Sequence, residues 1–212
     1  MANIKIYFCY RCNRIEIGVI VKKIIIRKAR KKDLPSVLSL IKELATYEQA
    51  PNEVKVTLKE LERDGFGRKK VYDCFVAEIQ PRDVGQFANG TNPSFGGGTH
   101  GKGKYLKSIA GMALYYTKYS TWKGRCLYLE DIIVTESMRR KGIGKKLFEG
   151  VIAVAKKIKV KKLEWQVLNW NEPAISFYKK YSTVFDDNEW MNCKLIFVPP
   201  SRDETKNKTI RT

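Results

Sequence analysis

A phosphate-binding turn is the first piece of chemistry that the sequence suggests. The apolar run that ends at Val134 is followed by Arg139-Arg-Lys-Gly-Ile-Gly144, where a strong helical pattern begins. Gly142 and Gly144 allow the backbone to turn tightly without side chains in the way. The N–H groups at the start of such a helix form a cradle for phosphate oxygens, and the helix dipole assists it. An ordinary glycine-containing turn is the alternative, and an isolated RxxGxG pattern favours it.

A second strand-to-helix unit follows and changes that balance. It runs from Trp165 to Tyr178, and Asn171 is positioned to cap its helix. Tyr178 lies seven residues after Asn171 and therefore two turns along the same face. A tyrosine there can also pack in the core with a hydrogen-bonded hydroxyl. The two units in this order are much more specific than either one alone.

The elements that must position these residues can be predicted from periodicity and capping signals. The expected strands are Ile24–Arg27, Val71–Ile79, Ser108–Tyr119, Leu127–Val134, Lys162–Leu168 and Trp190–Val198, with a hairpin of Ile4–Tyr10 and Ile15–Val21 before them. A first helix is expected to start after Asp33, and a second to start at the Thr57–Glu60 capping box and to end at Gly65. Two further helices are expected over Ile143–Ile158 and Glu172–Tyr181. Three consecutive strands favour an antiparallel meander, whereas the strand–helix–strand step after Leu127 needs a crossover. The sequence therefore predicts a mixed sheet in a single α+β domain.

Composition limits the classes of protein that remain. The 212 residues are 43% hydrophobic and 30% charged, which suits about one globular domain and excludes a membrane bundle or wholesale disorder. Because the chain has no apolar span of about 20 residues and an odd number of cysteines, we expect a reduced cytoplasmic protein. A lone Cys9–Cys12 pair and a single histidine, His100, make a metal site improbable.

The net charge of +19 makes an anionic partner a serious possibility. The lysines of residues 156–162 nevertheless fit the solvated end of a helix, so nucleic-acid binding is the less favoured interpretation. Only residues 47–80 lean acidic, with six basic and seven acidic side chains.

Taken together, these motifs resemble the GNAT superfamily of acetyl-CoA-dependent N-acetyltransferases, and within it the diamine (spermidine/spermine) N-acetyltransferases. The resemblance covers residues 24–198 and rests on the two units above, on Leu40–Glu48, on Asp64–Gly67 and on Leu127-Tyr-Leu-Glu-Asp131. It implies a GNAT-like α+β fold in which two parallel strands splay apart beside a bulge, and a homodimer. Residues 1–23 then form an N-terminal extension, residues 80–107 a loop insertion and residues 199–212 a polar tail.

The resemblance also implies where acetyl-CoA binds as co-substrate. Backbone groups of Ile132, Ile133 and Val134 would hold the pantetheine arm. The pyrophosphate would be wrapped by Arg139, Arg140, Lys141, Gly142, Ile143, Gly144 and Lys145. Asn171, Ala174 and Tyr178 would border the cofactor from the next helix.

By the resemblance, the expected substrate is a primary amine, namely a diamine, a polyamine or a lysine-like small molecule. Its site would be lined by Tyr47, Glu48, Glu130, Asp131, Glu164, Trp165, Gln166 and Glu189. An alkylammonium has a pKa of about 10.4 and must lose a proton before it attacks a thioester. Glu130, paired with Asp131 on the central strand, is the predicted base, and Tyr178 is the predicted acid for the leaving thiolate. Glu130 facing solvent as an ordinary strand carboxylate is the alternative. An amino sugar or a protein amine as substrate, or a non-catalytic basic nucleic-acid-binding protein, are the alternative functions.

Overall fold

The structure, a computed structural model, describes residues 4–9, 14–19, 22–81 and 108–185. The chain divides into two compact units, residues 1–166 and residues 167–212, which are described separately. Several predictions fall outside the described residues. These are Glu189, the strand Trp190–Val198, the polar tail, His100 with most of the loop insertion, and the side chains of Cys9 and Cys12.

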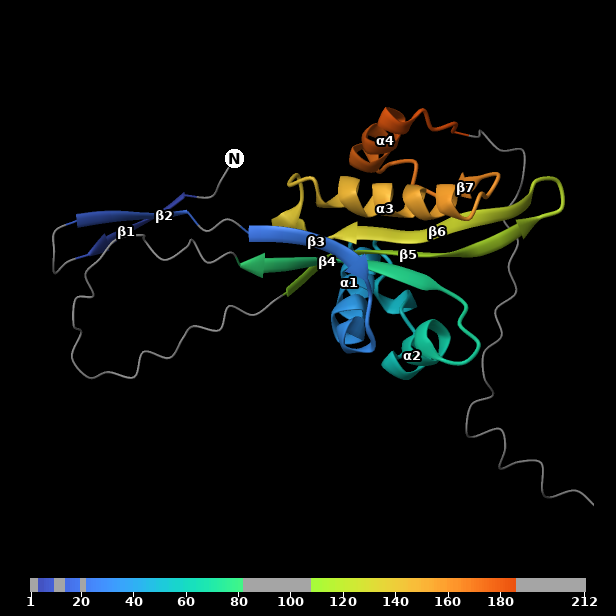
Figure 1. Ribbon diagram of the computed structural model, residues 1–212, viewed down its shortest axis with the longest axis horizontal. Helices are drawn as coiled ribbons and strands as arrows, with labels where there is room; N and C mark the ends of the chain where they lie inside the picture. The colour runs from blue at the N-terminus through green and yellow to red at the C-terminus, as the bar shows by residue number, and fades with distance from the viewer. Residues whose placement is uncertain (1–3, 10–13, 20–21, 82–107, 186–212) are drawn as a thin grey trace, which may run out of the picture. The chain divides into compact units, whose positions relative to one another are not determined.

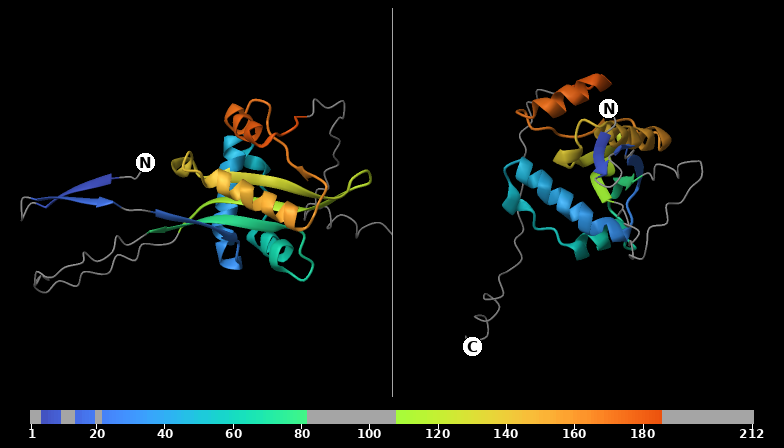
Figure 2. Two further views of the ribbon diagram at one scale, coloured as in Figure 1. Left: turned by 45° about the horizontal axis from the view of Figure 1, so that its top comes forward. Right: turned by 90° about the vertical axis from the view of Figure 1, so that its left-hand side faces the viewer.

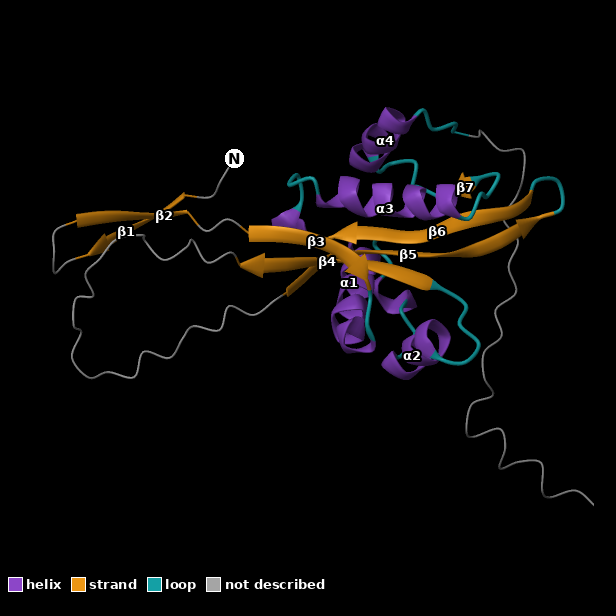
Figure 3. Cartoon of the chain, in the orientation of Figure 1, coloured by secondary structure: helices purple, strands orange, loops and turns teal. Residues whose placement is uncertain are grey.

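The first unit is built on a five-stranded mixed sheet in the order β3-β4-β5-β6-β7 (Figure 3). Its strands are β3 (Lys22–Lys28), β4 (Asp73–Pro81), β5 (Ser108–Ser120), β6 (Gly124–Val134) and β7 (Leu163–Glu164). The first four are antiparallel neighbours, and β7 is parallel to β6. A separate antiparallel pair, β1 (Ile4–Cys9) and β2 (Arg14–Val19), forms the predicted hairpin. The prediction of a mixed sheet is confirmed.

Helices cover both faces of this sheet. On one face lie α1 (Leu34–Tyr47) and α2 (Leu58–Phe66), and on the other lies α3 (Ile143–Lys157) (Figures 1 and 2). The core under α1 and α2 includes Val37, Leu61, Met112 and Ile133. In α3 the fully buried side chains recur at helical spacing, at Ile143, Leu147, Phe148 and Val151. Among the described residues, no helix is long and apolar enough to cross a membrane.

The capping signal of α2 is confirmed, but its predicted end is wrong. Thr57 Oγ1 accepts a hydrogen bond from Glu60 N at 3.2 Å, and the Glu60 carboxylate accepts one from Thr57 N at 2.8 Å. The helix continues through Gly65 to Phe66, and Gly67 is its C-cap. A Cβ at Gly65 would lie 2.5 Å from the hydroxyl of Tyr72, which donates to Leu61 O at 2.7 Å. Gly65 therefore makes room for a tyrosine ring and does not end the helix.

Asp33 precedes α1 as predicted, but its carboxylate does not cap that helix. It accepts hydrogen bonds from the Arg27 guanidinium at 2.6 and 3.0 Å, and Arg27 also pairs with Glu78 at 2.6 Å. Both carboxylates are buried, and the guanidinium holds the pKa of Asp33 below its usual value. This ion-pair network ties β3 to β4 and to the 3₁₀ turn η1 (Lys31–Asp33), and the sequence analysis missed it.

A bulge and a divergence of strands shape the middle of β6. Asp131 lies opposite Leu114 and Leu129 lies opposite Tyr115, so Glu130 is the extra residue of a β-bulge. The pairing of β6 with β7 ends at Tyr128 and Glu164, although β6 continues to Val134. The splayed parallel strands are thus present. The predicted strand Lys162–Leu168 shortens to Leu163–Glu164, because the chain beyond Glu164 leaves the side of β6 and has no ladder to join.

The second unit contains α4 (Glu172–Tyr178) and the 3₁₀ helix η4 (Lys179–Tyr181). The predicted helix Glu172–Tyr181 is therefore correct in place, but its last turn tightens into a 3₁₀ helix. Asn171 caps α4 as expected, because its side-chain oxygen accepts a hydrogen bond from Ala174 N at 3.3 Å.

Candidate active site

The turn before α3 has the backbone of an anion-binding site. Arg140 and Gly142 both adopt the left-handed conformation, with φ of 58° and 74°. Such a conformation costs a non-glycine residue about 1 kcal/mol, and strain of this kind concentrates at functional sites. The first hydrogen bond within the helix runs from Lys146 N to Gly142 O at 3.2 Å. The N–H groups of Ile143, Gly144 and Lys145 precede it and point out of the first turn.

The surroundings of this turn suit the pyrophosphate of acetyl-CoA. Of the described residues, a Cβ at Gly144 would meet only Val134, at 3.8 Å, so none of them fills the space beside this glycine. The side chains of Arg139, Arg140 and Lys141 are exposed, and Lys141 Nζ donates to Ser137 O at 2.9 Å. These cations, the free helix start and the small residue together fit a diphosphate group.

The C-terminal half of β6 offers backbone groups at the edge that β7 has left. Ile133 is only 5% exposed and packs in the core under α1, so its side chain is not available to a ligand. This agrees with a backbone role for residues 132–134. At the end of the strand, Arg139 Nε donates to Val134 O at 3.1 Å, and the Arg139 guanidinium lies 5.0 Å from the Tyr47 ring centroid. Tyr47, at the end of α1, therefore borders the predicted cofactor turn.

An acidic group forms where α1 ends beside the bulge of β6, and it comprises Glu48, Glu130 and Asp131. Glu130 is exposed and Asp131 is partly buried. Burial, followed by the charges of Glu130 and Glu48, raises the pKa of Asp131 from 3.8 to about 6. Burial also raises the pKa of Glu48, which follows α1 and donates its backbone N–H to Leu44 O at 2.9 Å. Three carboxylates thus converge in a chain whose net charge is +19.

Two tyrosines that the sequence analysis missed extend this group across the sheet. Tyr116 lies opposite Tyr128, which lies opposite Glu164, so one row crosses β5, β6 and β7. The rings of Tyr116 and Tyr128 are 5.4 Å apart. Burial, with the charge and hydrogen bonding of Glu130, raises the pKa of Tyr116 to about 12. Period-two alternation from Glu130 to Tyr128 was the available signal for the second tyrosine.

Glu164, at the β7 end of this row, lies beside two lysines. Lys162 Nζ lies 2.9 Å from Glu164 Oε1, and Lys118 Nζ lies 3.6 Å from Glu164 Oε2. The Lys118 ammonium also lies 5.4 Å from the centroid of the Tyr128 ring. Glu164 therefore lies at the far end of this row, beyond Tyr128 from the acidic group, with two cations beside it.

Other predicted substrate residues lie elsewhere. The Trp165 indole packs edge-to-face on Phe148 of α3, with ring centroids 5.1 Å apart, so it faces the side of the sheet opposite the acidic group. Gln166 is exposed. In the second unit, Tyr178 is 5% exposed, and burial raises its pKa to about 12. Its phenol is thus protonated at neutral pH.

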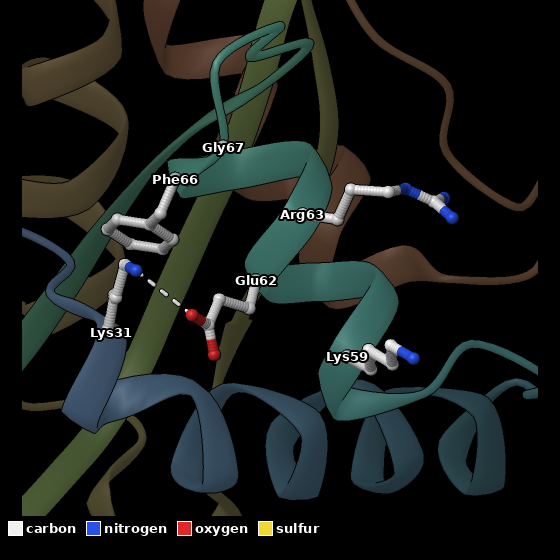
Figure 4. Close-up of a pocket in the computed structure, with 6 residues that line it drawn as sticks. All are labelled: Lys31, Lys59, Glu62, Arg63, Phe66 and Gly67. Carbon is white, nitrogen blue, oxygen red and sulfur yellow. Dashed lines mark hydrogen bonds and ion pairs between the residues drawn. The ribbon is translucent and has the colours of Figure 1, made fainter.

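A cavity of about 290 Å³ lies between η1 and α2 and is lined by Lys31, Lys59, Glu62, Arg63, Phe66 and Gly67 (Figure 4). An ion pair of 2.9 Å joins Lys31 to Glu62 across it, and both side chains are more than half exposed. None of the residues predicted to bind acetyl-CoA or the amine lines this cavity, so the candidate site lies at β6 instead.

Comparison with known proteins shows the family of this chain. The sequence model of the acetyltransferase (GNAT) family matches residues 58–182. Over 156 residues the chain is 39% identical to the thialysine N-epsilon-acetyltransferase of Bos taurus, covering 74% of this chain and 81% of that protein. Over 191 residues it is 30% identical to the L-ornithine N5-acetyltransferase NATA1 of Arabidopsis thaliana, covering 80% and 83%. Over 153 residues it is 32% identical to the spermidine/spermine N(1)-acetyltransferase-like protein 1 of Homo sapiens, covering 72% and 19%.

Among solved structures, the aminoglycoside acetyltransferase meta-AAC0020 from an uncultured soil metagenomic sample shares the fold. The TM-score is 0.57 at 16% identity, and the match covers 82% of this chain and 97% of that one. This likeness concerns the fold alone. With the curated relatives, it confirms the resemblance that the motifs indicate.

Proposed function

Because this chain belongs to the acetyltransferase (GNAT) family, it is an acetyl-CoA-dependent N-acetyltransferase, and we propose that it acetylates a short aliphatic primary amine such as a diamine or a lysine-like amino acid. The observation that carries this proposal is the acidic group of Glu48, Glu130 and Asp131. A cationic substrate needs carboxylates in its path, and here they gather in a chain that is otherwise strongly basic.

Acetyl-CoA supplies the thioester carbonyl that the amine attacks. The chain's own residues would hold it in place: the N–H groups of residues 143–145 would donate hydrogen bonds to the pyrophosphate oxygens, and Arg139, Arg140 and Lys141 would neutralise its charge. The backbone of residues 132–134 lies along the edge that β7 leaves free and would pair with the pantetheine arm. By the family resemblance, Asn171 and Ala174, at the start of α4 in the second unit, would also contact the cofactor.

The carboxylates prepare the amine for attack. An ammonium of pKa about 10.4 is drawn to Asp131 and Glu48, and its proton passes to Glu130, directly or through a water. A pKa near 6 makes Asp131 a stronger base than an ordinary aspartate, so it can share this role and is still ionised at pH 7.5. Removal of the proton from the amine is thereby coupled to binding of its cation.

Tyr178 is the proposed acid. A phenol with a pKa of about 12 keeps its proton at every physiological pH and can donate it to the departing sulfur. Full transfer from such a phenol to a thiolate of pKa about 8.5 is uphill, so we expect donation of a hydrogen bond to contribute as much as proton transfer. No covalent intermediate on the enzyme is needed.

A substrate screen that detects the free thiol of coenzyme A tests the proposal. The set contains diamines, polyamines, lysine, ornithine, thialysine, an amino sugar and a peptide with a free N-terminus. Short aliphatic amines should react, and Glu130→Gln should raise the amine KM by about tenfold or more. The control Glu53→Gln removes an exposed carboxylate of the 3₁₀ turn η2 (Pro51–Glu53) and should change nothing. Activity confined to the amino sugar or the peptide would contradict the proposed substrate class.

The proposal also includes a homodimer, which the resemblance implies and light scattering would test. A reducing, cytoplasmic location is part of it, since Cys74 and Cys126 are buried free thiols.

A further inference from the structure

The row of side chains that leads away from the acidic group ends in positive charge. Lys118 and Lys162 flank Glu164, so two cations face one carboxylate at this end. A polyamine lying along the row would meet like charge there, whereas a substrate with a negative end would meet complementary charge.

The spacing along the sheet matches one class of substrate. Asp131 lies opposite Leu114, and Tyr128 lies opposite Tyr116, two residues further along β5. Two residues of a strand span about 7 Å. Lys118 lies opposite Cys126, two residues beyond Tyr116, and its ammonium is 5.4 Å from the centroid of the Tyr128 ring, so it lies about one to two such steps from the level of Asp131. In an extended lysine, six bonds of about 1.5 Å place the side-chain nitrogen about 7–8 Å from the carboxyl carbon.

We propose that Lys118 binds the α-carboxylate of an amino-acid substrate whose side-chain amine lies at Glu130 and Asp131. Lys118 thereby favours lysine- and ornithine-like amino acids over the diamines that lack this carboxylate. The inference rests on the proposed function and names the substrate class of the same site.

The Lys118 ammonium is available for this role. Its side chain is 46% exposed, and at 3.6 Å from Glu164 Oε2 it is beyond hydrogen-bonding distance. That oxygen is buried and accepts no hydrogen bond from any described residue. Lys162, at 2.9 Å, is the lysine that neutralises Glu164. Lys118 can therefore pair with a substrate carboxylate without breaking a hydrogen bond.

Two matched pairs of substrates test the proposal directly: L-lysine with cadaverine, and L-ornithine with putrescine. The members of each pair differ only in the α-carboxylate. The wild-type enzyme should have the higher kcat/KM for the amino acid. Lys118→Met keeps most of the apolar stem and should lower kcat/KM for both amino acids by about 10-fold or more, through KM, as expected for the loss of one charge-assisted hydrogen bond. The diamines should be unaffected or should react faster.

Two further variants serve as controls. Lys118→Arg keeps the charge and should retain the preference for amino acids. Lys123→Met removes another exposed lysine, from the turn between β5 and β6, and should leave the kcat/KM for both members of each pair unchanged.

The outcomes separate this inference from the proposed function. Equal losses of kcat/KM for amino acid and diamine in Lys118→Met would overturn the role of Lys118 but leave the enzyme class intact. A wild-type preference for the diamines would overturn it as well. If the enzyme binds acetyl-CoA but acetylates none of the four compounds, the proposed function itself is wrong, and the inference falls with it.

Discussion

Replacing Asp131 by asparagine should make the protein more stable at neutral pH while making it a poorer enzyme. The Asp131 carboxyl is partly buried and lies near two other carboxylates, Glu130 and Glu48, and no cation of the described residues is among the causes of its pKa shift. Asparagine has nearly the same shape but carries no charge. The substitution therefore removes a repulsion that folding must overcome, and it also removes a group proposed to attract the ammonium of the substrate.

The size and the sign of the effect follow from the pKa of the carboxyl. Its rise from 3.8 to about 6 corresponds to at most about 3 kcal/mol, at about 1.36 kcal/mol per pKa unit. Because the pKa in the folded protein is above that in the unfolded chain, it is the ionised form that costs stability. This cost is absent below about pH 4, grows between pH 4 and pH 6, and is complete above about pH 6. After relaxation around the new amide, we expect a gain of about 1–3 kcal/mol at pH 7.5.

Urea denaturation of wild type and Asp131→Asn at pH 4, 5, 6 and 7.5 measures this difference. The two proteins should be equally stable at pH 4 and should diverge as the pH rises. Glu53→Gln, at an exposed site, should follow wild type at each pH. In parallel, the amine KM should rise by about tenfold or more with acetyl-CoA affinity unchanged. A difference in stability that does not depend on pH, or a variant less stable than wild type at pH 7.5, would refute the repulsive environment assigned to Asp131.

Three further substitutions test other parts of the argument. Gly144→Ala should leave stability unchanged or raise it by up to about 1 kcal/mol, since its Cβ would meet only Val134 at 3.8 Å, while calorimetry should show weaker acetyl-CoA binding. Unchanged affinity would contradict the pyrophosphate site. Tyr178→Phe should lower turnover by about 10²–10⁴-fold with acetyl-CoA affinity nearly intact, and wild-type turnover would exclude the acid role. Gly65→Ala should destabilise the protein by about 1–3 kcal/mol in urea, because its Cβ would lie 2.5 Å from the Tyr72 ring, and unaltered stability would contradict that packing.

Local signals predicted much of the fold because they act within a few residues. The capping box at Thr57, the cap at Asn171 and the glycines of the turn before α3 each specify one hydrogen bond or one backbone angle. They lie where the sequence indicates. The prediction that Gly65 ends the helix was wrong. Glycine is needed at this position because the Tyr72 ring, seven residues away in the chain, packs against it, and no local sequence rule reports such a contact.

The environment of the site could not be predicted in the same way. Glu48 and Asp131 are far apart in the chain, and only the packing of α1 against β6 brings their charges together. Trp165 shows the opposite case, because a local rule does predict which side of the sheet its side chain faces. Successive residues of a strand face opposite sides, so Glu164 and Trp165 should not both face the amine. The structure places the indole on Phe148.

The bulge at Glu130 explains why one strand can serve both substrates. In regular alternation, Glu130 and Asp131 would face opposite sides of the sheet, but the extra residue lets both charges act on Tyr128. The bulge lies just beyond the point where β6 parts from β7, so the carboxylates stand beside the backbone edge proposed for the pantetheine arm. Further along the same strand direction, the cations around Arg139 would attract the phosphates of acetyl-CoA under this proposal. The net charge of +19 therefore favours capture of an anionic co-substrate, while the local acidic group, retained at a cost in stability, is the group proposed to select a cation.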